Sequence, residues 1–132
     1  MIRREPFNYS LAEVDGVLVC RWTGVHHFSE EDRNRSRAAA REISERLQRH
    51  RRPVLLDLSK FDYTYSDGLS EWVHVSNACA ARKVRFAIRV SIDNPRVRMF
   101  IEIASRDGKV VDLIDSETEA LAFLKSDKAV AG

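Results

Sequence analysis

Residues 54–58 read Val-Leu-Leu-Asp-Leu, an almost unbroken apolar run that directly follows Pro53. A run of this length and composition is typical of a strand that is covered on both faces, as in a parallel sheet between helices. Upstream of it, residues 29–32 (Ser-Glu-Glu-Asp) have the form of a helix capping box, and apolar residues then recur at helical spacing as far as Leu47. The sequence therefore predicts a long helix over about 29–51 that leads into a central strand.

The segments on either side of this pair continue the alternation of strands and helices. The alternating residues 7–13 and the apolar run 17–23 flank Asp15-Gly16, a pair typical of a tight turn between antiparallel strands. Downstream, the periodicities predict a helix over 67–82, a strand over 86–90, a helix opening at Asn94-Pro95, a strand over 110–114 and a short helix after a second capping box at 116–119. The order ββαβαβαβα predicts an α/β sandwich with a mostly parallel five-stranded sheet, an antiparallel first strand and four helices.

The composition fits one globular domain. Hydrophobic residues make up 44% and charged residues 32% of the 132 residues, a mixture that excludes a disordered, collagenous or disulfide-scaffold protein. We expect a single domain over 1–126 and a frayed tail over 127–132. The formal net charge is only +2, which by itself does not indicate a polyanionic partner.

The cysteines and the hydropathy pattern indicate the cellular compartment in which we expect the protein. Cys20 and Cys79 lie far apart and match no metal-binding or redox spacing, which favours free thiols in a reducing environment. No apolar stretch approaches the roughly 18 residues of a membrane span, and no apolar segment of a signal peptide follows the basic start. We therefore expect a cytoplasmic protein without a membrane segment.

Polar and aromatic residues follow three of the predicted strands. The carboxyl ends of parallel strands meet at one edge of a sheet, and the segments expected at that edge are 24–28, 60–68 and 91–94. Within the second segment Phe61, Tyr63 and Tyr65 alternate, which would place their rings on one side of an extended loop. An exposed aromatic cluster of this kind indicates a protein interface or a self-association surface.

Five short segments resemble a known family in their order and spacing. They are 17–24 (Val-Leu-Val-Cys-Arg-Trp-Thr-Gly), 54–59 (Val-Leu-Leu-Asp-Leu-Ser), 66–69 (Ser-Asp-Gly-Leu), 94–97 (Asn-Pro-Arg-Val) and 115–121 (Asp-Ser-Glu-Thr-Glu-Ala-Leu). Together they resemble the STAS domain, the fold of anti-sigma factor antagonists and of the cytoplasmic tails of sulphate transporters. The resemblance spans about residues 8–125.

The resemblance implies a phosphorylation site. In the antagonists the corresponding loop reads Asp-Ser-x-Gly-Leu, and a partner anti-sigma kinase phosphorylates its serine; in this chain that serine is Ser66, followed by Gly68 and Leu69. This chain departs from the motif, because Tyr65 replaces the acid before the serine and Asp67 occupies the variable position. The alternative interpretation is therefore a divergent member of the family that has no phospho-switch. Taken without the family, Ser66 or Asp67 is simply the N-cap of the next helix.

Three other kinds of site have weaker support. His26 and His27 are adjacent, so in an extended segment their rings face opposite ways, and no second spaced ligand pair indicates a metal. A hydrolase elbow needs Gly-x-Ser-x-Gly around the serine, but Thr64 stands where the first glycine should be. The arginines of the first helix alternate with acids and have no aromatic platform beside them, which argues against a nucleic-acid partner.

The sequence therefore predicts a non-enzymatic regulatory module that resembles a bacterial anti-sigma factor antagonist and binds no metal or cofactor. Its partner would be a protein, such as an anti-sigma factor or a kinase-like regulator, or a second copy of the chain. The predicted interaction surface consists of Gly24, His26, His27, Phe61, Asp62, Tyr63, Tyr65, Ser66, Asp67 and Gly68. The alternative is a STAS-like module that binds a nucleotide or another small anion at the same strand ends; a hydrolase is the third choice.

Overall fold

The computed structural model describes residues 6–27, 29–63, 69–90, 95, 99, 102 and 112–125. Its sheet begins with a hairpin of β1 (Asn8–Val14) and β2 (Val17–His26), which pair antiparallel. Asp15 and Gly16 connect them, and their positive φ angles of 51° and 81° suit a tight turn whose twist matches that of the strands. The predicted hairpin is therefore confirmed at the predicted residues.

Parallel strands follow the hairpin in chain order. β3 (Val54–Tyr63) pairs with β2, β4 (Phe86–Arg89) pairs with β3, and the two-residue β5 (Asp112–Leu113) pairs with β4. The sheet order is β1-β2-β3-β4-β5, so every strand lies beside its predecessor and the order never reverses. The mixed sheet with an antiparallel first strand matches the prediction.

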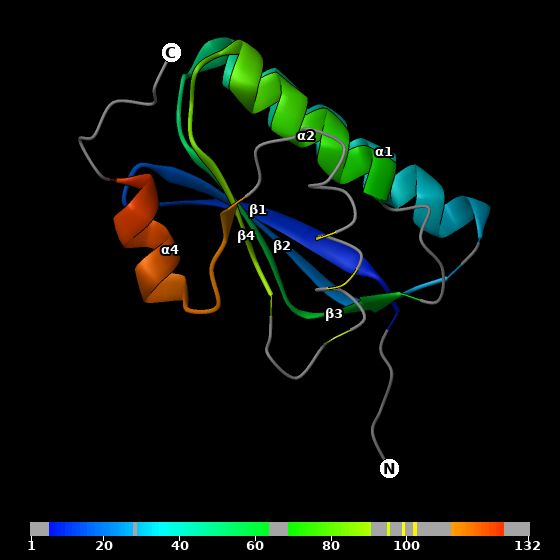
Figure 1. Ribbon diagram of the computed structural model, residues 1–132. Helices are drawn as coiled ribbons and strands as arrows, with labels where there is room; N and C mark the ends of the chain where they lie inside the picture. The colour runs from blue at the N-terminus through cyan, green and yellow to red at the C-terminus, as the bar shows by residue number, and fades with distance from the viewer. Residues whose placement is uncertain are drawn as a thin grey trace.

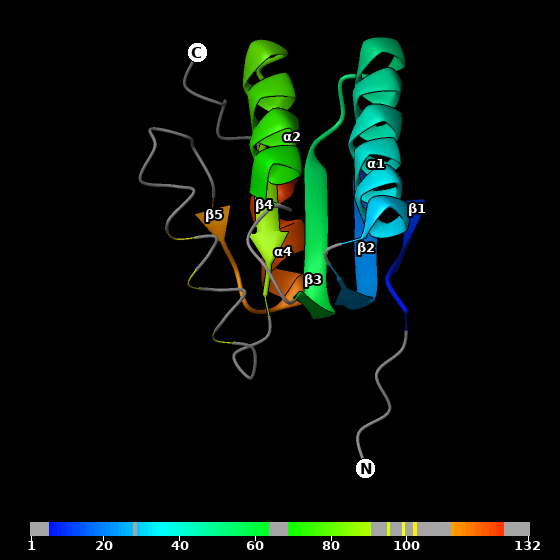
Figure 2. The same cartoon turned by 90° about the vertical axis from the view of Figure 1, so that its right-hand side faces the viewer.

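Helices lie on both faces of the sheet. α1 (Glu30–Arg49) and α2 (Leu69–Ala81) run side by side over one face, and α4 (Glu117–Leu124) covers part of the other (Figures 1 and 2). Right-handed crossovers explain this arrangement, because consecutive crossovers that advance in one direction place their helices on the same face. The predicted helix that opens at Asn94-Pro95 is described only at residues 95, 99 and 102, and the predicted tail lies outside the described residues.

The helix boundaries follow local capping chemistry. Ser29 is the N-cap of α1, and its hydroxyl accepts a hydrogen bond from the Asp32 backbone N–H at 3.1 Å. Ser116 caps α4 in the same way through the Glu119 N–H. Both predicted capping positions are thereby confirmed.

A β-bulge changes the alternation of side chains along β3. Arg21 pairs with Asp57 and Thr23 with Lys60, so three steps along β3 match two steps along β2. Leu58 and Phe61 consequently face the same core, although they lie three positions apart and would point to opposite faces of a regular strand. β3 also continues to Tyr63, beyond the predicted end of the strand near Leu58.

The core has two parts, one on each face of the sheet. Between the sheet and the paired helices, Trp22, Leu56 and Ile43 belong to a large cluster that also receives Val75 from α2. On the other face a smaller cluster packs beneath α4; it consists of Val17, Val19, Leu55, Ala87, Ala120 and Leu124. The two clusters pack on opposite faces of the sheet and so hold in place the strands whose ends form the candidate site.

Candidate functional site

The carboxyl ends of β2 and β3 lie side by side. Val25 pairs with Asp62 and His26 with Tyr63, so the described parts of the segments 24–28 and 60–68 share one edge, as predicted. Gly24, opposite Phe61, has a φ of 81°, a conformation that side-chain-bearing residues rarely adopt. The glycine therefore lets β2 change direction just before it reaches the edge.

Two residues of the predicted interaction surface are buried. His26 is 1% exposed and Phe61 is 2% exposed, so the prediction that Phe61 belongs to an exposed aromatic cluster is wrong. The bulge in β3 is the physical reason, because it turns Phe61 toward the core instead of toward solvent. His27, in contrast, is exposed, which agrees with the expectation that the two adjacent histidines face opposite ways.

His26 and Phe61 join an aromatic cluster at the end of the core. The Phe7 ring centroid lies 5.0 Å from that of Trp22 and 4.8 Å from that of His26, and Trp22 meets Phe61 edge-on at 5.3 Å. Such tilted and edge-to-face arrangements are the favoured geometries of aromatic pairs. Burial lowers the pKa of His26 against the opposing influence of the Asp32 carboxylate, which favours the neutral imidazole.

Hydrogen bonds to Asp32 link the two described residues between β2 and α1, His27 and Ser29. The His27 backbone N–H donates to Asp32 Oδ2 at 2.8 Å, while the Asp32 N–H donates to the Ser29 hydroxyl. Asp32 is itself buried, and the exposed Glu30 and Glu31 follow the cap in the first turn of α1. His27 and these two acids therefore form a preorganised part of the edge.

The remaining predicted residues have no described side chain. For Asp62 and Tyr63 the structure describes only the backbone, which belongs to β3. Tyr65, Ser66, Asp67 and Gly68 lie outside the described residues, so the assignment of Ser66 as phospho-acceptor stays a prediction. The described helix α2 begins at Leu69, the residue at which the family motif ends.

A charged network that the sequence did not reveal lies on the α4 face near the same edge. The Arg21 guanidinium donates to Asp57 of β3 and to Glu117 of α4. Arg89 of β4 donates to both carboxylate oxygens of Asp57, at 3.2 and 3.3 Å, and to the Ser59 hydroxyl at 3.0 Å. The network thereby connects three adjacent strands with the first turn of α4.

Asp57 is the centre of this network, with a side chain only 6% exposed. Burial alone would raise its pKa, but hydrogen bonds from Ser59 and the positive charges of Arg89 and Arg21 outweigh burial and hold the pKa below its ordinary value. The Ser59 backbone N–H, which lies at the bulge, donates to Asp57 Oδ1 at 3.0 Å. The carboxylate therefore also stabilises the bulge that buries Phe61.

A hollow of about 430 Å³ opens beside the network and is also lined by Thr23 and Lys60. Two arginines face two carboxylates there, so the charges of the network largely compensate one another. Its sequence signal is a charged residue within an apolar stretch of each of three strands, namely Arg21, Asp57 and Arg89. The register that aligns the three residues cannot be read from those strands separately.

The described residues offer little for metal or thiol chemistry. Within them no group of three or more His, Cys, Asp or Glu side chains is placed to hold a metal ion. Cys20 and Cys79 are both buried, and burial raises the pKa of each thiol to about 12, which keeps them protonated. No helix in the described ranges is both long enough and apolar enough to cross a bilayer.

The fold of this chain is similar to several solved structures. The chain superposes on an anti-sigma factor antagonist from Mycobacterium paratuberculosis with a TM-score of 0.71 and 17% identity, over 92% of this chain and 96% of that one. The chain has a STAS-like fold. The unphosphorylated anti-sigma factor antagonist SpoIIAA gives a TM-score of 0.66 at 16% identity, over 89% of the STAS-like chain and 96% of its own.

Two further structures extend the similarity. The phosphorylated form of the Bacillus cell fate determinant SpoIIAA has a TM-score of 0.65 at 14% identity, over 89% of this chain and 99% of that one. A protein of the DUF3478 family from Shewanella loihica with a SpoIIAA-like fold has a TM-score of 0.59 at 9% identity, over 94% and 99% of the two chains. No family model and no curated protein sequence matches the STAS-like chain. At these identities the likeness establishes the fold.

Proposed function

We propose that this STAS-like domain is a non-enzymatic regulatory module that docks a partner protein through the sheet edge formed by residues 24–28 and 60–68. The observation that carries the proposal is the superposition on an anti-sigma factor antagonist over nearly the whole of both chains. Proteins of that description act on an anti-sigma factor, so a protein partner of this class is the one the fold favours. The partner would be an anti-sigma factor or a kinase-like regulator.

The geometry of the edge supports docking there. His27 and Ser29 are both hydrogen-bonded to Asp32, and the pairing of β2 with β3 places residues 60–63 beside the end of β2. A prearranged surface loses little conformational freedom when a partner binds, which favours affinity. His27 and Lys60 are exposed at this edge and supply polar contacts, while Tyr63 and Tyr65 are the proposed aromatic anchors.

Phosphorylation of Ser66 is the proposed switch of this interaction. One neighbouring structure is of a phosphorylated SpoIIAA, and Ser66 occupies the motif position of the phosphorylated serine in the family. In the sequence Ser66 precedes Leu69, the first described residue of α2, by three positions, and backbone N–H groups and the helix dipole would favour a phosphate near a helix N-terminus. Asp67 opposes the modification by like-charge repulsion, so we expect a slower kinase reaction than in a chain with Asp67→Ala.

A small-ligand module is the second candidate, supported by the hollow of about 430 Å³ beside Arg21 and Arg89. The carboxylates of Asp57 and Glu117 already occupy the guanidinium groups on that side. An incoming anion would have to displace them. Partner docking therefore remains the function that we propose.

The test is capture of the partner from native extract, its identification, and titration with the purified protein. Tyr63→Ala or Tyr65→Ala should weaken binding roughly thirtyfold, the loss of about 2 kcal/mol that an aromatic anchor carries at an interface. Gln48→Ala, an exposed position at the far end of α1, is the matched control and should bind normally. Normal binding by both tyrosine variants would contradict docking at this edge.

A further inference from the structure

The end of the sheet opposite the proposed docking edge gathers basic side chains from two separate segments. Residues 46–52 (Arg-Leu-Gln-Arg-His-Arg-Arg) close α1, and residues 82–85 (Arg-Lys-Val-Arg) follow α2. Both helices run toward the end at which β3 and β4 begin (Figure 2). The Arg51 guanidinium donates two hydrogen bonds to the Arg82 carbonyl, at 3.0 and 2.7 Å, and so joins the segments.

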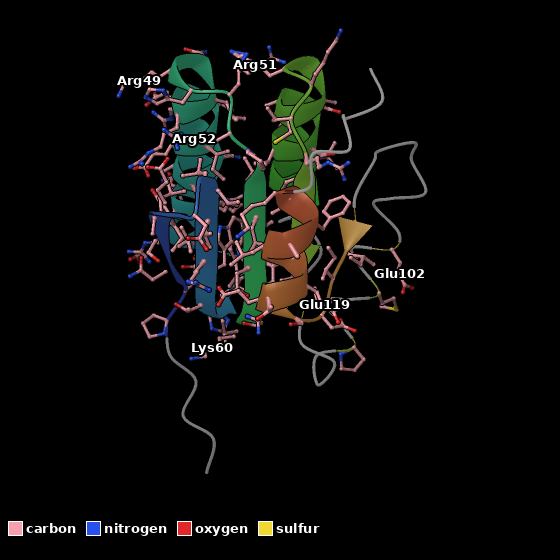
Figure 3. All side chains as sticks on the ribbon, turned by 90° about the vertical axis from the view of Figure 1, so that its left-hand side faces the viewer. Arg49, Arg51, Arg52, Lys60, Glu102 and Glu119 are labelled. Carbon is pink, nitrogen blue, oxygen red and sulfur yellow. The ribbon has the colours of Figure 1, made fainter. Side chains whose placement is uncertain are left out.

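The fold thus separates charges that nearly cancel in the whole chain. Figure 3 shows Arg49, Arg51 and Arg52 at one end of the molecule and Lys60 and Glu119 at the other. The capping acids of α1 and α4 also lie away from the arginine-rich end, at the N-termini of those helices. A net charge of +2 therefore conceals a strongly basic surface.

A hollow of about 380 Å³ opens at the basic end between the hairpin and the last turn of α1. Arg46, Arg49 and Arg52 line it, together with the buried Leu18 and Leu47. We call these five residues and their hollow the arginine pocket. Its volume lies within the range of roughly 300–1,000 Å³ that is typical of small-ligand sites.

Two of the three guanidinium groups are available. Arg52 is paired with the Glu13 carboxylate of β1. Arg46 and Arg49 are exposed and form no ion pair with any other residue that the structure describes. Glu13 and the partial negative charge at the end of α1 oppose an anion, but three full positive charges outweigh them.

The backbone that carries these arginines is firmly held. The His50 N–H donates to the Arg46 carbonyl at 2.9 Å, and the Arg52 N–H donates to the His50 carbonyl at 3.0 Å. The Leu18 N–H donates to the Pro53 carbonyl at 2.9 Å, which fixes the turn into β3 against β2. The positions from which the guanidinium groups reach into the pocket are therefore preorganised.

We propose that the arginine pocket binds a small oligophosphate anion. Guanidinium groups match phosphate oxygens with pairs of parallel hydrogen bonds, and a group with several charges engages more than one arginine at once. The apolar floor of Leu18 and Leu47 lowers the local dielectric and strengthens these contacts. A singly charged anion fills neither the volume nor the set of donors.

The experiment is isothermal titration of the full chain with sodium tripolyphosphate at constant ionic strength, with sodium sulfate titrated for comparison. We expect saturable binding of tripolyphosphate that exceeds the binding of sulfate. The double variant Arg46→Gln/Arg49→Gln should weaken it by about tenfold or more, because it removes two of the three guanidinium groups that would bind the phosphate oxygens. Arg41 is an exposed arginine of the same helix that lies outside the pocket, so its charge acts on a bound anion only from a distance. Arg41→Gln should therefore change the affinity for tripolyphosphate by less than about twofold.

Three outcomes would overturn the proposal. In the first, tripolyphosphate binds no better than sulfate. In the second, Arg41→Gln weakens binding as much per charge as the pocket variants do, which would indicate general charge attraction. In the third, a DNA duplex binds and tripolyphosphate does not, which would assign the basic end to an extended polyanion. None of these results bears on the tyrosine test, since the pocket lies at the opposite end of the sheet.

Discussion

Side chains along β3 alternate between two unlike environments. Leu56 and Leu58 enter the apolar core beneath α1 and α2, whereas Asp57 and Ser59, on the opposite face, bind the guanidinium groups of neighbouring strands. Aliphatic and aromatic packing covers the first face. On the second face, beyond α4, ion pairs between partly exposed side chains lie beside an open hollow.

Helix length explains the difference. α1 has 20 residues and is about 30 Å long at 1.5 Å per residue, which matches the ten residues of β3 at about 3.3 Å each. α4 has eight residues and reaches only about 12 Å, so it covers the apolar part of its face and no more. In the part of the chain that the structure describes, charged side chains cover the rest. The comparison teaches that, where a helix is much shorter than the strands beneath it, side chains of the strands must cover the remaining part of that sheet face by pairing with one another.

The largest expected effect tests the apolar face. Trp22 is 2% exposed and touches the rings of Phe7 and Phe61. Trp22→Ala should lower the free energy of unfolding by about 3–5 kcal/mol, the range for deletion of a large buried aromatic side chain. Urea denaturation measures it, with the exposed neighbour Thr23→Ala as control. A loss below about 1 kcal/mol would mean that this face does not carry the stability.

The next effect tests the charged face. Asp57→Ala leaves two arginines without their shared carboxylate and should cost about 2–3 kcal/mol, somewhat less than for a fully buried pair because both arginines are partly exposed. Replacing all three residues by apolar ones, as Arg21→Met/Asp57→Leu/Arg89→Met, should recover most of that loss. Urea denaturation of both variants gives the comparison. If the triple variant is less stable than Asp57→Ala, the ion pairs stabilise this face by themselves.

The smallest effect concerns pH and the aromatic cluster. Burial lowers the pKa of His26 in the folded chain, so below its ordinary value of 6.5 the unfolded chain binds a proton more readily than the folded chain does. Stability should therefore be complete above pH 6.5 and fall as the pH decreases below it, by at most about 1.4 kcal/mol per pH unit for one proton. Urea melts at pH 7.5 and 5.5 measure the difference.

Matched histidine variants identify the source of that pH dependence. His26→Gln should reduce the stability difference between the two pH values, whatever its effect on stability itself. His27→Gln, at the exposed neighbouring position, should leave the difference as it is in the original chain. An unchanged difference in His26→Gln would assign the pH dependence to other groups.

The features that could be predicted from the sequence are those specified by neighbouring residues. Asp15-Gly16 is sufficient for the hairpin turn, Ser29 and Asp32 for the start of α1, and Pro53 for the passage from helix to strand. The family motifs then indicated the fold that the solved structures share. Each of these signals lies within a few residues of the structure that it determines.

The features that could not be predicted depend on register between distant segments. Arg21 and Asp57 are 36 residues apart and Asp57 and Arg89 are 32 apart, so their network exists only once three strands are aligned. The bulge likewise appears only when β3 is paired with β2, and without it Phe61 would be assigned to the wrong side. Phe61 of the predicted interaction surface is therefore buried, although the strand ends that were predicted to share an edge do lie side by side.

The unbroken order of the strands has a kinetic consequence. Each strand pairs with the one that precedes it in the chain, so no strand has to wait for a segment that is synthesised later. The β1–β2 hairpin can form within about 1–10 μs, and β3 can add once α1 has followed it. A sheet of this kind can grow strand by strand as the ribosome releases it, because each new strand adds beside the strand that was released just before it.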